Sequence, residues 1–187
     1  MPQLSVIVPT FNETDNVVEL RNRVAIALEG VDWEMIFVDD DSPDGTARAL
    51  REMAQQDRRV RCIQRVGRRE LSSACIEGML ASSAPVVAVI DADLQHDERL
   101  LPKMFELIES EPLDVVVGSR YADDGSVGEW SERRASLSRM ATRMSRALLI
   151  DPRILILDEA TSSVDSTTEK EIQKALDNLV RGRTTIA

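Results

Sequence analysis

The sequence predicts an α/β fold built around a mostly parallel sheet, and two observations carry the prediction. Short apolar segments rich in β-branched residues alternate with longer segments whose apolar residues recur at helical spacing. Three of the short segments also run directly into acidic or polar loops. In an open parallel sheet the ligand-binding loops follow the carboxyl ends of the strands, so these loops are expected to share one edge.

The expected strands are short apolar runs bounded by turn-forming residues. The first is rich in Val and Ile and leads into TFNE, and the second and fourth lead into DDDSPDGT and DADLQH. In chain order the expected strands are Leu4–Pro9, Glu34–Val38, Val60–Ile63, Val86–Ile90, Val115–Val117 and Ile154–Leu157.

Each expected helix follows a strand, and capping or turn residues precede the first two. Thr14 and Asp15 stand before the first helix, and Asp44 and Gly45 are expected to make the turn into the second. In chain order the expected helices are Val17–Leu28, Thr46–Gln55, Ser72–Ser82, Arg99–Ser110, Glu132–Leu149 and Thr168–Leu179.

The composition of the 187-residue chain, with 43% hydrophobic residues and a net charge of −10, is typical of a globular protein. The acidic charge argues against sequence-independent nucleic-acid binding, so no nucleic-acid partner is expected. Cys62 and Cys75 are too few for a disulfide framework or zinc site, which favours a reducing, cytoplasmic location. The sequence does not begin like a signal peptide, and no apolar run reaches the ~18 residues of a transmembrane segment.

The most informative segment is DADLQH, which follows the expected strand Val86–Ile90. Residues two apart on an extended chain point the same way, so the carboxylates of Asp91 and Asp93 converge beyond the strand. With Gln95 two residues further on, these oxygen donors suit Mg²⁺ or Mn²⁺ bound to a diphosphate. The alternative is that one Asp caps the next helix and the other is solvated in a loop.

Five segments, SVIVPTFNE, FVDDDSPDGT, LSSACIEGM, VAVIDADLQH and VVVGSRY, occur in this order within residues 4–134. In residue identity and order they resemble glycosyltransferase family 2, and within it the polyprenyl-phosphate (dolichyl-phosphate) mannosyltransferases. The resemblance implies a Rossmann-like GT-A fold that binds a nucleotide sugar. It also implies the inverting transfer of a hexose, mannose from GDP-mannose, to a polyprenyl phosphate.

The resemblance also assigns residues to the two substrates and to the metal. Asp91, Asp93 and Gln95 are implied metal ligands. Asp93, Arg120 and Arg134 are implied catalytic residues that stabilise the departing diphosphate and align the acceptor phosphate. The implied substrate contacts are Pro9, Phe11, Glu13, Val38, Asp40, Asp91, Ala92, Asp93, Arg120 and Arg134. Two alternatives stay open, namely a turn with a buried Phe11 and an Arg120 that is simply exposed.

Other residues of these loops are expected to act indirectly. The run Asp39–Asp41 places three carboxylates together, and they repel one another unless a ligand or cation lies near. His96, the only histidine, is expected to support its loop rather than to catalyse. Glu70 replaces a glycine that the resembled family usually has before LSSA, and it is expected to disturb the helix entry.

The segment Glu132–Leu149 has an apolar stripe with Arg139, Arg143 and Arg146 on its opposite side. A basic amphipathic helix suits an anionic membrane surface, where a lipid-phosphate acceptor would be found. The expected location is therefore cytoplasmic and peripheral to the membrane. The alternative is an ordinary surface helix with its stripe on the core.

The C-terminal residues resemble a different family. ILILDEATSSVD is similar to the Walker B strand and D-loop of an ABC-transporter ATPase, although the chain lacks the G-x-x-x-x-G-K-[ST] loop that holds ATP. We therefore expect a C-terminally truncated GT-A domain over residues 1–149 and an ATPase-like β-α appendage over residues 150–187. A Walker B strand is normally buried among its own neighbours, so Ile154–Leu157 is expected to dock loosely or stay apart.

Two other functions stay open on the sequence alone. The chain could be an ABC-transporter ATP-binding fragment, which the missing phosphate loop argues against. It could also be a non-catalytic nucleotide-sugar-binding remnant from a composite gene, because the ATPase-like tail replaces the acceptor-side segments of the resembled family.

Overall fold

The computed structural model describes residues 1–118, 153–157 and 185–186 of the chain. These residues form a seven-stranded sheet in the order β3-β2-β1-β4-β6-β5-β7, in which all neighbouring strands are parallel. Their carboxyl ends therefore meet at one edge. The strands are β1 (Leu4–Thr10), β2 (Trp33–Asp39), β3 (Val60–Gln64), β4 (Val86–Val89), β5 (Val115–Gly118), β6 (Arg153–Leu157) and β7 (Thr185–Ile186).

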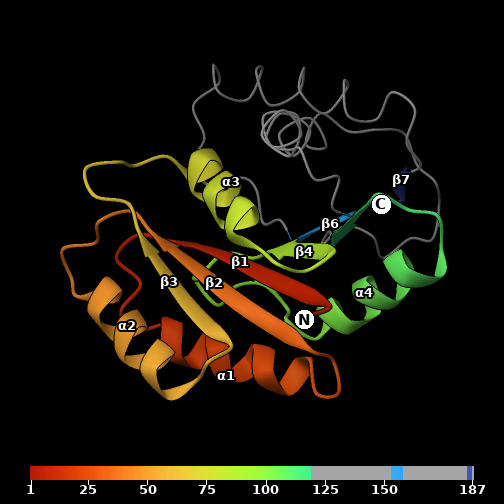
Figure 1. Ribbon diagram of the computed structural model, residues 1–187, viewed down its shortest axis with the longest axis horizontal. Helices are drawn as coiled ribbons and strands as arrows, with labels where there is room; N and C mark the ends of the chain where they lie inside the picture. Colours follow the sequence, from red (N-terminus) through yellow and green to blue (C-terminus); the bar gives the residue numbers. More distant parts are fainter. Residues whose placement is uncertain (119–152, 158–184, 187) are drawn as a thin grey trace.

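Helices cover both faces of the sheet. The helices within residues 1–118 are α1 (Val17–Ala27), α2 (Thr46–Gln56), α3 (Leu71–Ala81) and α4 (Leu100–Ser110). α1, α2 and α4 lie against one face and α3 lies against the other (Figure 1). None of these helices is long and apolar enough to cross a bilayer.

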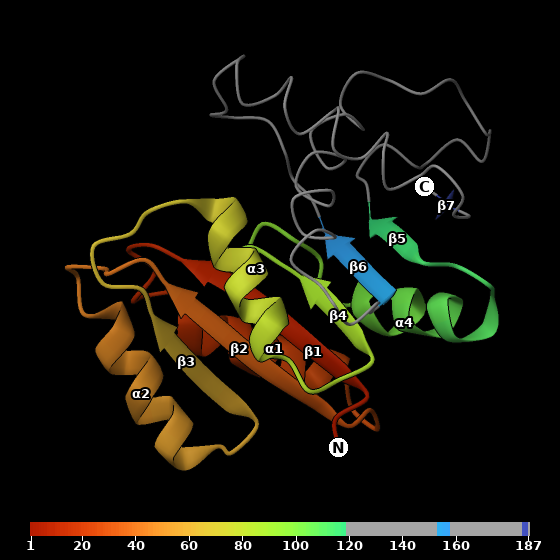
Figure 2. The ribbon, with the colours of Figure 1, turned by 45° about the horizontal axis from the view of Figure 1, so that its top comes forward.

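Two apolar cores hold the layers together, one on each face of the sheet. The alternation along β1 shows how they arise, because Leu4, Val6 and Val8 join the core beneath α1 and α4, whereas Ile7 joins the core beneath α3. All four side chains are fully buried. Figure 2 shows the same arrangement with the top tilted forward, so that α3 is seen lying across β1 and β2.

The predicted elements agree closely with the structure. Each strand and helix expected within residues 1–118 is present, and its ends lie within one residue of the predicted ends. The short strand β7 was not predicted. The expected helices Glu132–Leu149 and Thr168–Leu179, and the proposed boundary between residues 149 and 150, lie outside the described residues.

The expectation that Ile154–Leu157 docks loosely or stays apart is wrong. β6 pairs with β4 on one side, where Val87 is opposite Ile154, and with β5 on the other, where Val116 is opposite Leu155. Backbone N–H and C=O groups inside a protein need partners, and a strand between β4 and β5 provides them for both neighbours. This demand for backbone pairing decides the position of β6.

α3 approaches the sheet closely at Gly78. A Cβ atom at this position would collide with Ile7 Cγ2 and lie 3.0 Å from Val38 Cγ2. Both neighbours are fully buried and β-branched, so neither can easily move aside. The missing side chain of Gly78 thus allows α3 to pack on β1 and β2. Two of the loops at the carboxyl edge of the sheet, here called the edge loops, follow these strands.

We expect Gly78→Ala to lower the free energy of unfolding by about 1–3 kcal/mol, because the added methyl group overfills the core. The change is opposite to the gain of ~1 kcal/mol that alanine normally gives over glycine inside a helix. Urea unfolding would measure it, with Leu80→Ala at an exposed position of the same helix as the control. A Gly78→Ala variant more stable than the parent would contradict the close packing.

Candidate functional site

The carboxyl ends of β1, β2 and β4 form the candidate site. β1 and β2 end level with each other, because Thr10 pairs with Asp39. β4 lies on the other side of β1, where Ile7 pairs with Val89 and its carbonyl accepts the Ile90 N–H at 3.1 Å. The loops that follow these three strands therefore emerge side by side, as the sequence predicts.

Carboxylates from two of these loops lie close enough to interact. Burial, together with the charges of Asp93 and Glu13, raises the pKa of Asp91 to about 6. Burial also raises the pKa of Glu13, opposed by a hydrogen bond from Asn16 and assisted by the charges of Asp93 and Asp44. The loops after β1 and β4 thus gather negative charge that a bound cation would relieve.

A divalent cation fits this site when phosphate oxygens share in binding it. In the described part of the chain, no group of three or more His, Cys, Asp or Glu side chains is arranged to hold a metal alone. Asp91 and Asp93 nevertheless supply hard oxygen donors, and burial, followed by the charges of Asp93 and Glu13, raises the pKa of Asp91. Gln95 lies next to them, because its N–H donates to Asp93 Oδ1 at 3.0 Å.

His96 supports the loop after β4. Its side chain is buried, and its Nδ1 accepts the N–H of Asp91 at 3.3 Å. Accepting at Nδ1 requires that this nitrogen carry no proton. Ala92 is buried within the same loop. The structure thus gives His96 the supporting role that the sequence predicts.

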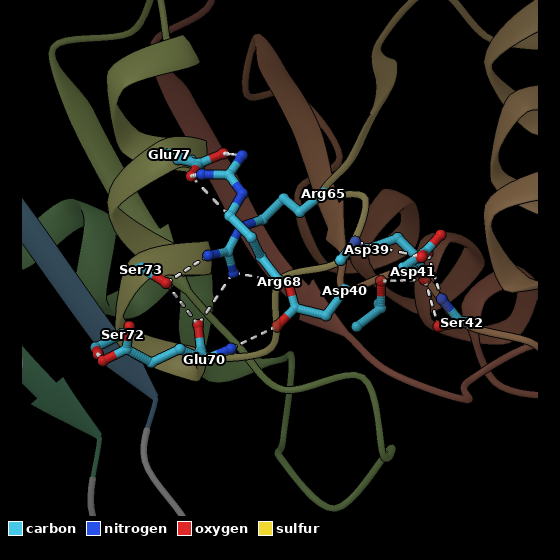
Figure 3. A network of polar contacts seen from close by, with 12 residues as sticks. Asp39, Asp40, Asp41, Ser42, Arg65, Arg68, Glu70, Ser72, Ser73 and Glu77 are labelled. Carbon is cyan, nitrogen blue, oxygen red and sulfur yellow. Dashed lines mark hydrogen bonds and ion pairs between the residues drawn. The ribbon is translucent and has the colours of Figure 1, made fainter.

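The expected repulsion among the carboxylates of Asp39–Asp41 is relieved by the chain itself, in part by the cationic side chain of Arg65. The chain itself provides a hydrogen-bond donor for each of them (Figure 3). The donors are Ser42 N to Asp39 Oδ2 at 3.0 Å, Arg65 Nη1 to Asp40 Oδ1 at 2.7 Å, and Gln64 Nε2 to Asp41 Oδ1 at 2.8 Å. These partners stabilise the run without a ligand.

Arg65 is a site residue that sequence analysis missed. Its side chain is only 2% exposed, and its Nη1 donates to Asp40 and, at 3.1 Å, to the Glu70 carbonyl. Its Nη2 donates to Ser73 Oγ, and its Nε lies 3.4 Å from Glu77 Oε1 without hydrogen-bond geometry. The guanidinium therefore ties the loop after β2 to the start of α3. Its position just after an apolar strand is the one signal for it in the sequence.

Glu70 does not disturb the entry into α3, contrary to expectation. Its backbone is extended, with φ −163° and ψ 118°, and the helix begins regularly at Leu71. The Glu70 N–H donates to Asp40 Oδ2 at 2.8 Å, and its carbonyl accepts the Ala74 N–H at 3.0 Å. The position uses backbone groups in a conformation open to any residue, so glycine is not required there.

Asp44 and Gly45 make the turn into α2, as predicted. The N–H and hydroxyl of Thr46 donate to Asp44 Oδ1 at 3.0 and 2.6 Å, and the Thr14 N–H donates to Oδ2 at 3.1 Å. Burial disfavours the charged carboxylate, but these hydrogen bonds outweigh it and lower the pKa of Asp44. Gly45 has φ 96°, in the left-handed region that favours glycine.

Phe11 stands exposed at the edge of the sheet. Its side chain is 39% exposed, which rules out the alternative of a turn with a buried phenylalanine. Pro9 and Val38 face each other in the register of β1 and β2, and both are buried. Val38 packs in the core beneath α3.

Most of the predicted substrate contacts thus come together at one edge of the sheet. The described ones lie at the ends of β1, β2 and β4, and they are Pro9, Phe11, Glu13, Val38, Asp40, Asp91, Ala92 and Asp93. Arg120 and Arg134 lie outside the described residues.

This chain belongs to glycosyl transferase family 2, whose family model matches residues 5–166. The match passes through the ILILDEATSSVD segment, and the comparisons lend no support to its resemblance to an ATPase. The parallel sheet, with acidic loops at its carboxyl edge, is the GT-A arrangement that the sequence predicts.

Two curated relatives are named dolichol-phosphate mannosyltransferase. The protein from Pyrococcus furiosus is 40% identical over 147 residues, which are 79% of this chain and 41% of that protein. The protein from Saccharomyces cerevisiae is 34% identical over 152 residues, which are 79% of this chain and 56% of that protein. The chain thus spans about half the length of these relatives.

A solved structure with a similar fold is a mannosyltransferase from Pyrobaculum calidifontis in complex with GDP-Man and Mn²⁺. The TM-score is 0.56 at 23% identity, and the alignment covers 66% of this chain and 37% of the other. At this identity the comparison supports the fold.

In EDTA, we expect Asp91→Asn to stabilise the protein at pH 7–8 by up to about 3 kcal/mol. The pKa of Asp91 is higher in the folded protein, at about 6, than its ordinary value of 3.8. The folded protein therefore favours protonated Asp91. The stability that this protonated side chain provides is complete below pH 3.8 and is lost as the pH rises through 6. Thermal unfolding across pH 4–8 would measure the difference, which should vanish near pH 4. An equal effect of Asp91→Asn near pH 4 and at pH 7–8 would contradict the raised pKa of Asp91.

Proposed function

We propose that this chain contains the donor-binding part of a glycosyltransferase that moves mannose from GDP-mannose to a polyprenyl phosphate with inversion. The observation that carries the proposal is the meeting of Glu13, Asp91 and Asp93 at the carboxyl edge, beside the exposed ring of Phe11. The names of the dolichol-phosphate mannosyltransferase relatives also support it.

In this proposal the loops after β1 and β2 bind the nucleoside. Pro9, Phe11 and Glu13 surround the base and ribose, and Val38 lies beneath them. Asp40 accepts hydrogen bonds from the base. Arg65 and the Glu70 N–H occupy one acceptor position on each oxygen of Asp40. A carboxylate has about four such positions, so two remain for a ligand.

Asp93 and Gln95, with Asp91, would hold Mg²⁺ or Mn²⁺ together with the diphosphate of the donor. When bound, the cation stabilises the charge that develops on the departing diphosphate. His96 contributes indirectly, because its Nδ1 holds the N–H of Asp91. Ala92 is buried and adds no charged side chain between the two aspartates.

The acceptor phosphate is already ionised near neutral pH, so the reaction needs alignment rather than a general base. We propose that Arg120 and Arg134 provide this alignment through forked contacts with phosphate oxygens. The acceptor is a lipid, so the proposed place of action is the cytoplasmic face of a membrane, with the protein bound peripherally.

We predict that the chain binds GDP at least about tenfold more tightly with Mg²⁺ or Mn²⁺ than with EDTA, a difference of ~1.4 kcal/mol. The reason is that the cation links the anionic diphosphate to carboxylates that would otherwise repel it. Titration calorimetry would measure both affinities.

Asp93→Ala should remove this metal dependence. The control is Asp32→Ala, because Asp32 is 64% exposed and lies before β2, at the opposite edge of the sheet. Equal GDP affinity with metal and with EDTA in the parent chain would refute the proposed metal site.

A further inference from the structure

Arg69 and Phe11 form a stacked pair at the edge of the sheet. The guanidinium carbon of Arg69 lies 4.4 Å from the centre of the Phe11 ring. Arg69 belongs to the loop between β3 and α3, and Phe11 to the loop after β1. Both side chains are exposed, so the contact links two loops on the surface where the donor is proposed to bind.

Arg69 differs from the two other arginines of its loop in having no carboxylate partner. Arg65 pairs with Asp40, and both terminal nitrogens of Arg68 donate to Glu77, with Nη2 at 3.1 Å from Oε2 (Figure 3). Among the residues that the structure describes, no carboxylate lies within ion-pair distance of Arg69. Its N–H donors are thus available to a ligand, in a chain whose net charge is −10.

The backbone holds Arg69 close to Asp40. Glu70 directly follows Arg69, and its N–H donates to Asp40 Oδ2 at 2.8 Å. The peptide group between Arg69 and Glu70 thus lies at the Asp40 carboxylate, while the Arg69 guanidinium lies over the Phe11 ring. Of these residues, Asp40 and Phe11 are expected contacts from the sequence, whereas the position of Arg69 is known only from the structure.

We propose that Arg69, oriented by stacking on Phe11, reads the nucleobase of the donor together with Asp40. A guanine ring presents the N1 and N2 hydrogens for a carboxylate, and its O6 and N7 form the acceptor pair that an arginine fork recognises. The proposal rests on the proposed function, which requires a GDP-linked donor, and it identifies the residue that selects the base.

Calorimetry on the full chain with Mg²⁺ would test the proposal, using GDP, UDP and inorganic pyrophosphate as probes. Arg69→Ala should weaken GDP binding about tenfold or more, which corresponds to ~1.4 kcal/mol. Pyrophosphate binding should change less than about twofold, because a base contact is absent from it. Arg69→Lys keeps the charge without the fork and should also lose most of the preference for GDP over UDP.

The matched control is Arg68→Ala, which removes a neighbouring arginine that faces Glu77. Its GDP affinity should stay within about twofold of the parent, since Arg68 has no place in the proposed base site. Two outcomes would overturn the inference while leaving the proposed function standing. One is an unchanged GDP affinity in Arg69→Ala, and the other is an equal loss for GDP and pyrophosphate, which would make Arg69 a phosphate contact. Failure of the parent chain to bind GDP at all would instead refute the proposed function.

Discussion

The edge loops depend on the buried ion pair between Arg65 and Asp40. A guanidinium that is 2% exposed is tolerated because its partners belong to the chain itself. Through the contacts of Arg65, the loop after β2, the end of β3 and the start of α3 are joined. Losing either partner would leave a buried charge uncompensated, at a cost of about 3–5 kcal/mol. Glu70 binds the same carboxylate through its N–H, so the position of Arg69 also follows from the pair.

The parallel sheet gathers unfavourable negative charge at the same edge where the ligand is proposed to bind. Its register sets the ends of β1, β2 and β4 side by side, so the loops that follow them must share one space. The loop after β2 satisfies its acidic residues internally through Arg65, Ser42 and Gln64. In the loops after β1 and β4, Glu13 and Asp93 also accept hydrogen bonds, but no arginine within the described part of the chain pairs with them, and burial beside other carboxylates raises the pKa of Asp91. Excess charge thus remains where a cation and a diphosphate are proposed to bind.

The sequence predicts those features that depend on local patterns. The apolar runs and helical periodicity place the elements within residues 1–118 to within one residue, and the i, i+2 spacing brings Asp91 and Asp93 together. Arg65 and Arg69 escape prediction because their roles arise from contacts between distant segments, with Asp40 and Phe11. The sequence does not predict the position of β6, because its pairing with β4 and β5 depends on backbone hydrogen bonds between segments far apart in the chain.

The central claim is that a divalent cation and a nucleoside diphosphate bind together at the carboxyl edge of the sheet. Amide-resolved NMR with trace Mn²⁺, recorded with and without GDP, tests it most directly, because Mn²⁺ broadens the signals of nearby amides. With GDP present, the amides of Ala92, Asp93 and Gln95 and those of the loop after β1 should broaden first, while Asp32 and Arg59 at the opposite edge stay sharp. Broadening centred on the opposite edge, or a pattern that GDP does not change, would contradict the account.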